Sequence, residues 1–330
     1  MGSNKRILSG MRPTGPLHLG NLHGALANWV EMQNEYECFF FIADWHALTS
    51  DYEKPSAIVG YVDEMMIDWL SAGLDPEKST LFVQSLVPEH AELFMLLSMI
   101  TPVPWLERNP TYKDQIVQMN NKDLSTFGFL GYPVLQAADI IMYKADGVPV
   151  GVDQIPHVEI TREIARRFNF LYGDVFPEPE AVLTKTSKIL GLDRRKMSKS
   201  YNNAIYLSDS ADEIRTKVSQ MVTDPQRMRK SDPGNPDICN VFEFHKIYSD
   251  QPTWEEIDSQ CRQAKIGCVE CKKIMAENVI NAMQPLHERR SHFMSRPERV
   301  EEIIQNGSAK ARSVAKKTMD EVRAAIRIRK

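Results

Sequence analysis

Residues 7–21 read ILSGMRPTGPLHLGN, and this stretch predicts a short strand, a tight turn and the start of a helix. Residues 7–9 form an apolar start, residues 13–16 form a Pro- and Gly-rich turn, and Leu22 and Leu26 begin a helical spacing of apolar residues. A glycine in such a turn lets a nucleotide approach the backbone, and the N-terminus of the helix presents unpaired N–H groups. The stretch therefore predicts a nucleotide-binding turn, and the alternative is a tight turn with a capping residue.

Strand and helix patterns alternate beyond this turn. Residues 38–43 are a continuous apolar run rich in aromatic side chains, which is typical of a strand buried on both faces. Two further strands are predicted at 80–83 and 148–150, with helical patterns between them. This alternation favours βαβ units, so we expect an α/β fold with a Rossmann-like, doubly wound parallel sheet. Strand patterns then fade, which predicts a sheet domain over 1–205 and an all-helical domain over 206–330.

The composition is that of a soluble globular protein. The chain has 330 residues, of which 42% are hydrophobic and 25% charged, and its net charge is −4. Its longest apolar run is far short of the ~20 residues that a membrane span needs, and no signal-peptide core follows Met1. We therefore expect a cytoplasmic protein with no membrane segment. The negative charge argues against a uniformly basic surface for nucleic acid, but residues 301–330 carry eight Lys or Arg against four acidic residues, a net +4.

A second motif lies near the end of the predicted sheet domain, where residues 196–200 read KMSKS. Its two lysines, three positions apart and accompanied by hydroxyl groups, could close over a pyrophosphate and neutralise the charge that develops as it leaves. A solvated basic loop would show the same composition. The order of the two motifs, about 175 residues apart, favours one shared nucleotide site over that alternative.

The two motifs together resemble those of the class I aminoacyl-tRNA synthetases. Residues 18–21, HLGN, are similar to the HIGH motif of that class, and residues 196–200 match its KMSKS motif letter for letter. Longer stretches resemble the bacterial tryptophanyl-tRNA synthetases, namely residues 9–15, 43–47, 132–140 and 148–154. The resemblance covers nearly the whole chain. It implies a catalytic domain with the KMSKS loop at its end, followed by a helical domain that binds the tRNA anticodon.

The resemblance implies a reaction in two steps. L-tryptophan and ATP, with Mg²⁺, would form tryptophanyl-AMP and pyrophosphate, and the tryptophan would then pass to the 3′ end of tRNA(Trp). The family acts as a homodimer, so a second copy of the chain is a further expected partner. Tyrosyl-tRNA synthetases are the nearest alternative. A small-molecule nucleotidyltransferase could use the first motif, but it would lack the KMSKS run and the large helical domain.

Matching positions imply the residues of the ATP site. The catalytic residues would be His18, Gly20, Asn21, Lys113, Lys196 and Lys199. ATP would be bound by the two motifs and by two further loops, at Arg12, Pro13, Thr14, Gly20, Asn21, Gly151, Val152, Asp153, Ile189, Lys196, Met197, Ser198, Lys199 and Ser200. The chain departs from the family at Arg12, where Gln is usual, and at Val152, where Glu is usual, so the polar contacts at these two positions would change.

Asp139 matches the carboxylate that binds the indole in this family. An indole N–H only donates, so an acceptor in an otherwise apolar pocket favours tryptophan over phenylalanine, which would leave that acceptor unpaired. The other residues implied in the tryptophan pocket are Tyr132, Gln136, Gln154, His46, Val148 and Val150. Two alternatives stay open: Asp139 could pair with a cation such as Lys144, and His46 could be a satisfied core histidine.

Four of the five cysteines fall within 33 residues: Cys239, Cys261, Cys268 and Cys271. Four thiolates suit tetrahedral zinc or an iron–sulfur cluster, and four unconnected packing thiols are the third possibility. A branch of the bacterial tryptophanyl-tRNA synthetases with this pattern carries a 4Fe–4S cluster, so the resemblance implies a structural cluster of that type, with zinc as the alternative. The thiols alone would also suit an iron–sulfur electron carrier, which would need no ATP site.

Basic residues of the predicted helical domain are candidate contacts for tRNA phosphates. They are Arg227, Arg229, Lys230 and the basic residues of the segment 310–330. An ordinary solvated helix face is the alternative for each of them.

Overall fold

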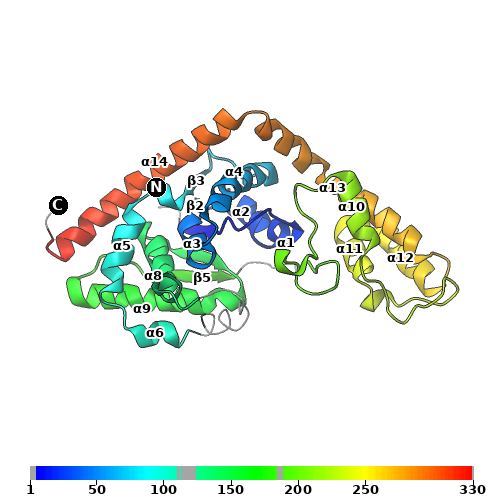
Figure 1. The fold of residues 1–330 in the computed structure, drawn as a ribbon, viewed down its shortest axis with the longest axis horizontal. Coiled ribbons are helices and arrows are strands. Elements are labelled where there is room, and N and C mark those ends of the chain that lie inside the picture. The colour runs from blue at the N-terminus through cyan, green and yellow to red at the C-terminus, as the bar shows by residue number, and fades with distance from the viewer. Residues whose placement is uncertain (1–4, 110–111, 113–123, 184–188, 329–330) are drawn as a thin grey trace. The chain divides into compact units, whose positions relative to one another are not determined.

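The computed structural model describes residues 5–109, 112, 124–183 and 189–328 (Figure 1). The chain forms two compact units. The first, which we call the sheet unit, consists of Met1–Gly15, Asn28–Lys185 and Arg296–Lys330, and the second, the helical unit, consists of Pro16–Ala27 and Thr186–Ser295. Each unit is therefore assembled from segments that lie far apart in the sequence.

Five parallel strands form the sheet, in the spatial order β3-β2-β1-β4-β5. They are β1 (Arg6–Met11), β2 (Glu37–Ile42), β3 (Ser79–Val83), β4 (Gly147–Val150) and β5 (Glu180–Leu183). Ile7 of β1 pairs with Cys38 of β2 on one side and with Gly147 of β4 on the other. The strand order reverses between β1 and β4, which is the arrangement of a doubly wound sheet. The predicted α/β class and parallel sheet are confirmed.

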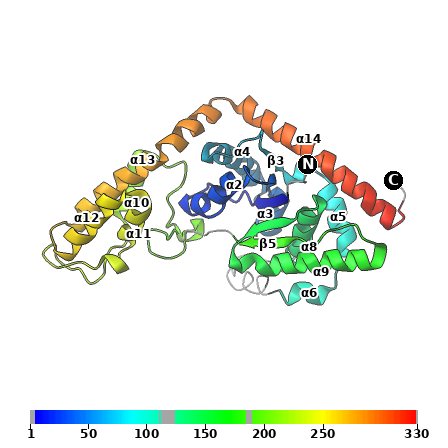
Figure 2. The same ribbon diagram turned by 180° about the vertical axis from the view of Figure 1, so that it is seen from behind.

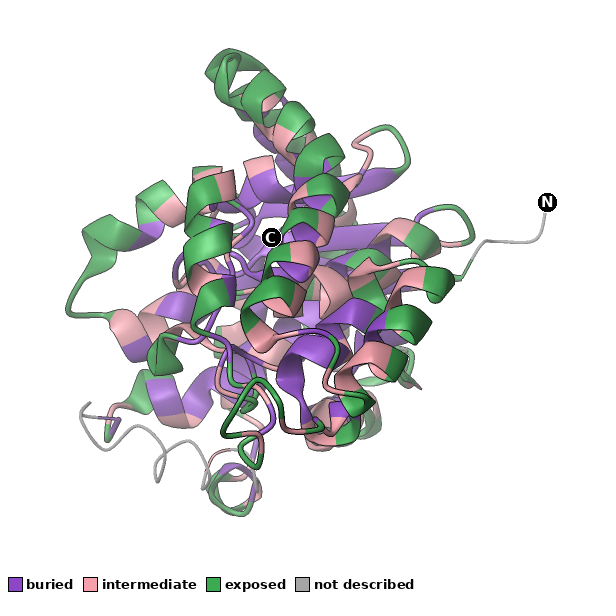
Figure 3. Ribbon diagram, turned by 90° about the vertical axis from the view of Figure 1, so that its right-hand side faces the viewer, coloured by how far each residue is buried: buried purple, intermediate pink, exposed green. Residues whose placement is uncertain are grey.

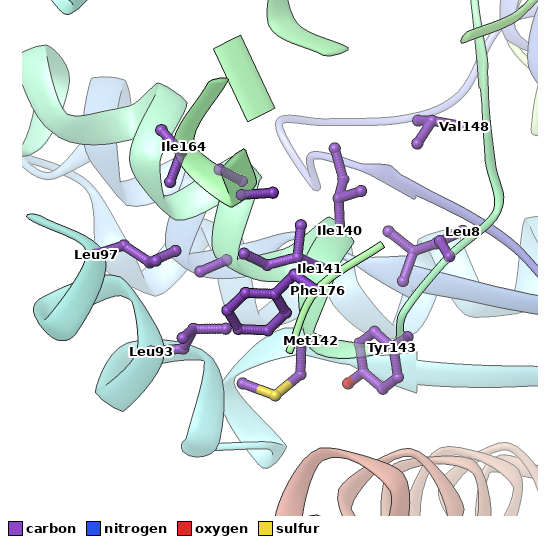
Figure 4. Close-up of a cluster of buried hydrophobic side chains, with 14 of the residues drawn as sticks. Leu8, Leu93, Leu97, Ile140, Ile141, Met142, Tyr143, Val148, Ile164 and Phe176 are labelled. Carbon is purple, nitrogen blue, oxygen red and sulfur yellow. The ribbon is translucent and has the colours of Figure 1, made fainter. Parts of the chain in front are cut away.

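Helices connect the strands of the sheet unit. They are α2 (Ala27–Met32), α3 (Asp44–Asp51), α4 (Pro55–Ala72), η2 (Gln84–Leu86), α5 (Glu89–Ser98), α6 (Val103–Glu107), α8 (Phe127–Met142), η3 (Val152–Gln154) and α9 (Ile155–Tyr172). Figure 4 shows the core cluster, in which Leu8 of β1 lies near Ile140 of α8 and the α5 side chains Leu93 and Leu97 lie on the opposite side of α8. Burying one large apolar side chain completely contributes about 1.5–3 kcal/mol to the stability of the folded state. This cluster therefore stabilises the packing of the helices on the sheet.

The last helix, α14 (Pro297–Ala325), packs along the edge strand β3 within the sheet unit (Figures 1 and 2). A Cβ on Gly307 would lie 1.7 Å from the carbonyl oxygen of Leu81, so the helix can approach the strand this closely only at a glycine. The amide of Val83 also donates to Ser308 Oγ (3.4 Å). The helix thus covers backbone groups that an edge strand would otherwise expose.

The compact units differ from the predicted ranges 1–205 and 206–330 in two places. Residues 296–330 pack with the sheet, where α14 buries a row of small and apolar side chains: Ala311, Ala315, Met319 and Val322. Residues 16–27 pack with the helical unit, together with residues 189–205. The roles assigned to the two predicted domains, catalysis and anticodon binding, stay predictions.

The helical unit contains short turns near its two motifs and longer helices beyond them. Its elements are α1 (Leu19–Asn21), the π-helical turn η1 (Leu22–Leu26), η4 (Lys199–Tyr201), α10 (Ala211–Ser219), η5 (Pro236–Ile238), α11 (Asn240–Tyr248), α12 (Gln251–Arg262) and α13 (Cys268–Met294). Burial colouring shows helices with one buried face and one exposed face (Figure 3). None of the helices in the described parts of the chain is long and apolar enough to cross a membrane.

Candidate active site

The predicted site residues fall into two sets, one in each unit. The helical unit holds His18, Gly20, Asn21, Ile189 and Lys196 to Ser200. The sheet unit holds the loop residues Arg12, Pro13, Thr14, Gly151, Val152 and Asp153, together with Asp139 and its predicted neighbours. Lys113, predicted as a further catalytic cation, lies outside the described residues, and so does the side chain of Asp153.

In the helical unit the first motif is anchored to the chain that follows the second motif. The Leu19 amide donates to the Ile205 carbonyl (3.0 Å), and the Leu207 amide donates to the Leu17 carbonyl (2.9 Å). These bonds flank a bridge between His18 and Tyr206. Two motifs that are far apart in the sequence therefore share one framework, as their order in the chain predicts.

His18 lies against the second motif. A Cβ on Gly20 would lie 3.0 Å from the His18 ring and 3.5 Å from Met197 Cβ, so a glycine keeps this corner open. Burial, followed by the charges of Lys199 and Lys196, lowers the pKa of His18 to about 4. The ring is therefore neutral at physiological pH. Its buried Nδ1 has no hydrogen-bond partner among the described residues, so it is available to a ligand.

Asn203 fixes the backbone of the KMSKS loop. Its side chain is 2% exposed, it accepts from the Ser198 amide (2.8 Å), and it donates to Asp193 (2.6 Å) and to the Lys196 carbonyl (3.2 Å). Gly191 provides the space for it, because a Cβ there would lie 2.2 Å from the Asn203 amide nitrogen. The sequence reasoning missed Asn203, since it lies beyond the motif in an ordinary polar run.

In the sheet unit the ATP-loop candidates follow two neighbouring strands. Arg12, Pro13 and Thr14 come after β1, while Gly151 and Val152 come after β4. Carboxyl ends of parallel strands meet at one edge, and the point where the strand order reverses is the usual ligand site of such a sheet. The Val152 side chain is 73% exposed and apolar, so it can offer no polar contact in place of the usual Glu.

Asp139 on α8 is 1% exposed and accepts hydrogen bonds from three side chains. His46 Nε2 of α3 lies 2.8 Å from Oδ2, and Gln84 Nε2 donates to both oxygens at 2.8 and 2.9 Å. His90 Nδ1 of α5 contacts Oδ1. Burial by itself would raise the pKa of Asp139, but the hydrogen bonds from His46 and His90 outweigh it and lower the pKa, so the carboxylate is ionised.

These contacts decide the two alternatives left open by the sequence. Lys144 does not neutralise Asp139, because its ammonium group pairs with Glu321 (2.6 Å). His46 is a satisfied and largely buried histidine, yet its partner is the predicted indole acceptor. Gln84 and His90 were missed by the sequence reasoning. One feature of the sequence could have indicated Gln84: it is a polar residue that directly follows a fully buried strand.

The remaining tryptophan-pocket candidates are Tyr132 and Gln136 on α8, Val148 and Val150 on β4, and Gln154 at the end of η3. Tyr132 is 8% exposed, and its hydroxyl lies 3.2 Å from His157 Nε2. Burial raises the pKa of Tyr132, while the charge of Arg12 opposes that rise, so Arg12 lies near this pocket. Val148 and Val150 are buried in the core cluster, and Gln136 and Gln154 are half-buried.

The four cysteines all lie in the helical unit as free thiols. Arg227 Nη1 contacts the sulfur atoms of Cys261 (3.8 Å) and Cys268 (3.9 Å). Burial raises the pKa of Cys239, of Cys261 and of Cys271, and nearby cysteines add to each rise. The donor chemistry thus suits a soft metal, but among the described residues no three His, Cys, Asp or Glu side chains are arranged to hold an ion.

Known proteins match the chain over nearly its full length. A family model described as "tRNA synthetases class I (W and Y)" matches residues 2–284. The tryptophan–tRNA ligase of Thermotoga maritima is 53% identical, with 98% of this chain and 99% of that protein covered, and the Aquifex aeolicus ligase is 47% identical, with 98% and 100% covered.

Solved structures agree with the sequence matches. A tryptophanyl-tRNA synthetase from Campylobacter jejuni, crystallised with ADP and tryptophan, superposes with a TM-score of 0.89 at 35% identity, covering 98% of this chain and 100% of that one. A tyrosyl-tRNA synthetase from Archaeoglobus fulgidus shares the fold, with a TM-score of 0.65 at 18% identity. The predicted family is confirmed: the chain belongs to the class I tRNA synthetases and, within them, to the tryptophan–tRNA ligases.

Proposed function

We propose that this enzyme activates L-tryptophan with ATP and transfers it to the 3′ end of tRNA(Trp). The observation that carries the choice of amino acid is Asp139, an ionised and buried carboxylate at the place where the resemblance expects the indole acceptor. An indole N–H donates to such a group, whereas the side chain of phenylalanine cannot. The Tyr132 hydroxyl and the half-buried Gln154 are the polar groups that we assign to the amino-acid backbone of the substrate.

In the first step a carboxylate oxygen of tryptophan attacks the α-phosphorus of ATP. The new bond joins that oxygen to phosphorus, and the bond between the α-phosphorus and the bridging oxygen breaks to release pyrophosphate. Lys196 and Lys199 neutralise the charge that develops on the leaving group, and Mg²⁺ bound with the ATP adds to this effect. His18, which is neutral and whose Nδ1 has no partner in the described part of the chain, contributes a hydrogen bond without a charge. In the second step the ribose of the terminal tRNA adenosine displaces AMP.

ATP–pyrophosphate exchange with a panel of amino acids tests the proposal. Tryptophan should support exchange, while phenylalanine should support it at least roughly 10⁴-fold less, because its side chain has no donor for the buried Asp139 carboxylate. Exchange that depends on tyrosine would overturn the assignment. Charging of tRNA(Trp) with labelled tryptophan then tests the transfer step, and we expect the enzyme in the cytoplasm, where tRNA is used.

We further propose that a second copy binds through an apolar patch of the sheet unit. Met95 of α5, Met99 directly after it, Val103 of α6 and Phe127 of α8 are 50%, 72%, 50% and 69% exposed, and α5 and α6 both pack on α8. Exposed apolar side chains gathered on adjoining helices are typical of a protein interface. Light scattering should give a homodimer, and Met99→Asp should give a monomer with unchanged far-UV circular dichroism.

For the four cysteines we propose a 4Fe–4S cluster with a structural role, and zinc is the alternative. The support is the donor set itself, four thiols whose charges influence one another within one unit. Protein purified without oxygen should be brown and contain four irons per chain, as expected of such a cluster. A colourless protein with one zinc per chain would exclude it, and a protein with neither metal would favour four packing thiols.

We assign anticodon binding to the helical unit. A groove of about 710 Å³ in that unit is lined by Arg227, Arg229, Lys230 and Lys273, with Glu270 as its acidic residue. Basic side chains along a groove suit phosphates. Substituting Lys230 and Lys273 with Ala should weaken charging of tRNA(Trp) and leave pyrophosphate exchange unchanged.

A further inference from the structure

Behind Asp139 lies a second, fully buried layer of polar groups. His90 and Tyr143 are both 0% exposed, and His90 Nε2 lies 2.7 Å from the Tyr143 hydroxyl. The rings of Phe41 and Phe82 lie 6.1 and 6.2 Å from the His90 ring, so the surroundings are apolar. A polar chain in such surroundings is costly unless every member is satisfied.

The direction of the protons in this chain follows from its end groups. An ionised carboxylate only accepts, so His90 must donate from Nδ1 to Asp139. Among the described residues, His90 is the one partner recorded for the Tyr143 hydroxyl. If Tyr143 accepted this bond, its own O–H would be buried without an acceptor. The arrangement that satisfies every group therefore has Tyr143 donating to Nε2 of a neutral His90.

The two oxygens of Asp139 differ in the exposure of their histidine partners. His90 contacts Oδ1 and His46 contacts Oδ2. The side chain of His46 is 9% exposed, whereas that of His90 is 0% exposed. A substrate that enters from the accessible side thus meets Oδ2 and the His46 donor first. Oδ1 is held from the closed side.

We propose that His90, oriented by Tyr143, is a positioning residue for tryptophan selection. His90 holds Oδ1 of Asp139 from the buried side, so that Oδ2 is oriented toward the indole N–H. The indole N–H then replaces His46 as a donor to Oδ2. The proposal rests on the proposed function, in which Asp139 accepts from the indole. The Tyr143 hydroxyl thus orients the Asp139 carboxylate through His90 without touching the substrate.

Tyr143→Phe is the informative variant, because it removes one oxygen and keeps the ring that stacks on Phe39 at 5.0 Å. The substrates are tryptophan and 3-benzothienylalanine, an analogue in which sulfur replaces the indole N–H. We expect kcat/KM for tryptophan to fall about 10-fold in the variant, which is the size of effect from one lost buried hydrogen bond. Activation of the analogue should hardly change, so the preference for tryptophan shrinks.

A matched control and a second variant separate this role from folding. Tyr248→Phe removes an equivalent bond, from a tyrosine hydroxyl to His23 Nε2 at 2.7 Å in the other unit, and it should leave the preference unchanged. His90→Gln keeps a donor toward Asp139 and should retain more of the preference than His90→Leu. Equal losses on both substrates in Tyr143→Phe would overturn the proposal. If Asp139→Asn also left the preference intact, the proposed indole contact itself would fail.

Discussion

Asp139 and His18 are both buried polar residues, but their surroundings differ in kind. Every oxygen of Asp139 has partners from the protein, supplied by three side chains of the sheet unit. His18 has a buried nitrogen with no partner among the described residues, and it lies beside two lysines in the helical unit. Under the proposed function, the amino-acid contact is built before the substrate arrives, whereas the phosphate contacts are completed by the ligand.

The strongest test of this contrast is Asp139→Asn. The amide NH2 would face Gln84 and one of the two histidines, all of which donate to the carboxylate, and the substitution would remove the charge that they stabilise. We expect kcat/KM for tryptophan to fall roughly 1,000-fold, since breaking one side of a buried pair costs about 3–5 kcal/mol. Pyrophosphate exchange measures it, and the KM for ATP should stay the same.

Asp68→Asn is the matched control, because Asp68 is also 1% exposed but lies on α4, which carries none of the predicted site residues. It should lower the stability of the protein and spare the kinetics. If both variants lost activity equally, the effect of Asp139 would be one of folding.

In the helical unit, Lys199→Ala removes a cation from the KMSKS loop. Under the proposed function Lys199 neutralises the charge that develops on the leaving pyrophosphate, so kcat should fall about 100-fold while the KM for tryptophan is unchanged. Arg195→Gln serves as the control, since Arg195 is an exposed cation of the same loop that pairs with Asp193 (2.6 Å). A rise in the KM for tryptophan in Lys199→Ala would contradict the division of roles between the two regions.

Asn203→Ala is expected to have a smaller effect, because Asn203 acts on the loop and not on the substrate. It removes three hydrogen bonds around Ser198 and Lys196, so kcat should fall about 10-fold and the free energy of unfolding should drop by about 1–3 kcal/mol. Kinetics and urea unfolding measure the two effects. A stable variant with full activity would show that the loop does not need this clamp.

The fold was largely predictable from local patterns, and its exceptions are instructive. The four predicted strands correspond to β1–β4, but β5 (Glu180–Leu183) was missed, since it is a short edge strand with half-exposed side chains and little apolar pattern. The packing of α14 against the sheet was also missed, because residues 206–330 were predicted to form one helical domain. It depends on Gly307 meeting Leu81, a contact between residues more than two hundred positions apart that leaves no trace in local periodicity.

The charge of the C-terminal tail shows why composition alone misleads. Residues 301–330 carry a net +4, which suggested contacts with tRNA phosphates. Within the sheet unit, however, Arg312 pairs with Glu89 (3.0 Å) and Arg323 with Glu92 (2.8 Å between Nε and Oε1). These two charges attach α14 to α5, so a truncation near residue 308 should unfold the sheet unit and not merely weaken tRNA binding.

Residues of the candidate site could be proposed from the sequence only where a motif marks them. His18, Lys196 and Lys199 lie in short runs that resemble known motifs, and Asp139 was found by resemblance. Gln84 and His90 belong to no such run, and their importance comes from the packing of η2 and α5 beside α8. Residues that position other residues are therefore the part of the site for which the structure is needed.

The smallest expected effect is a dependence of the free energy of unfolding on pH. It distinguishes His18 from Asp139 and needs no substrate. The pKa of His18 is about 4 in the folded chain and about 6.5 when unfolded, so this group contributes stability above pH 6.5 that is lost as the pH falls toward 4. From pH 7 to pH 6 the loss should be about 0.7 kcal/mol. Asp139 does not change the stability between pH 7 and pH 6. Its pKa is lowered, so the stability that it contributes is lost only at a pH below the usual range of a carboxyl group. Urea unfolding of His18→Asn should show a smaller step than the unsubstituted protein, and an equal step in both would mean that His18 is solvated in the folded chain.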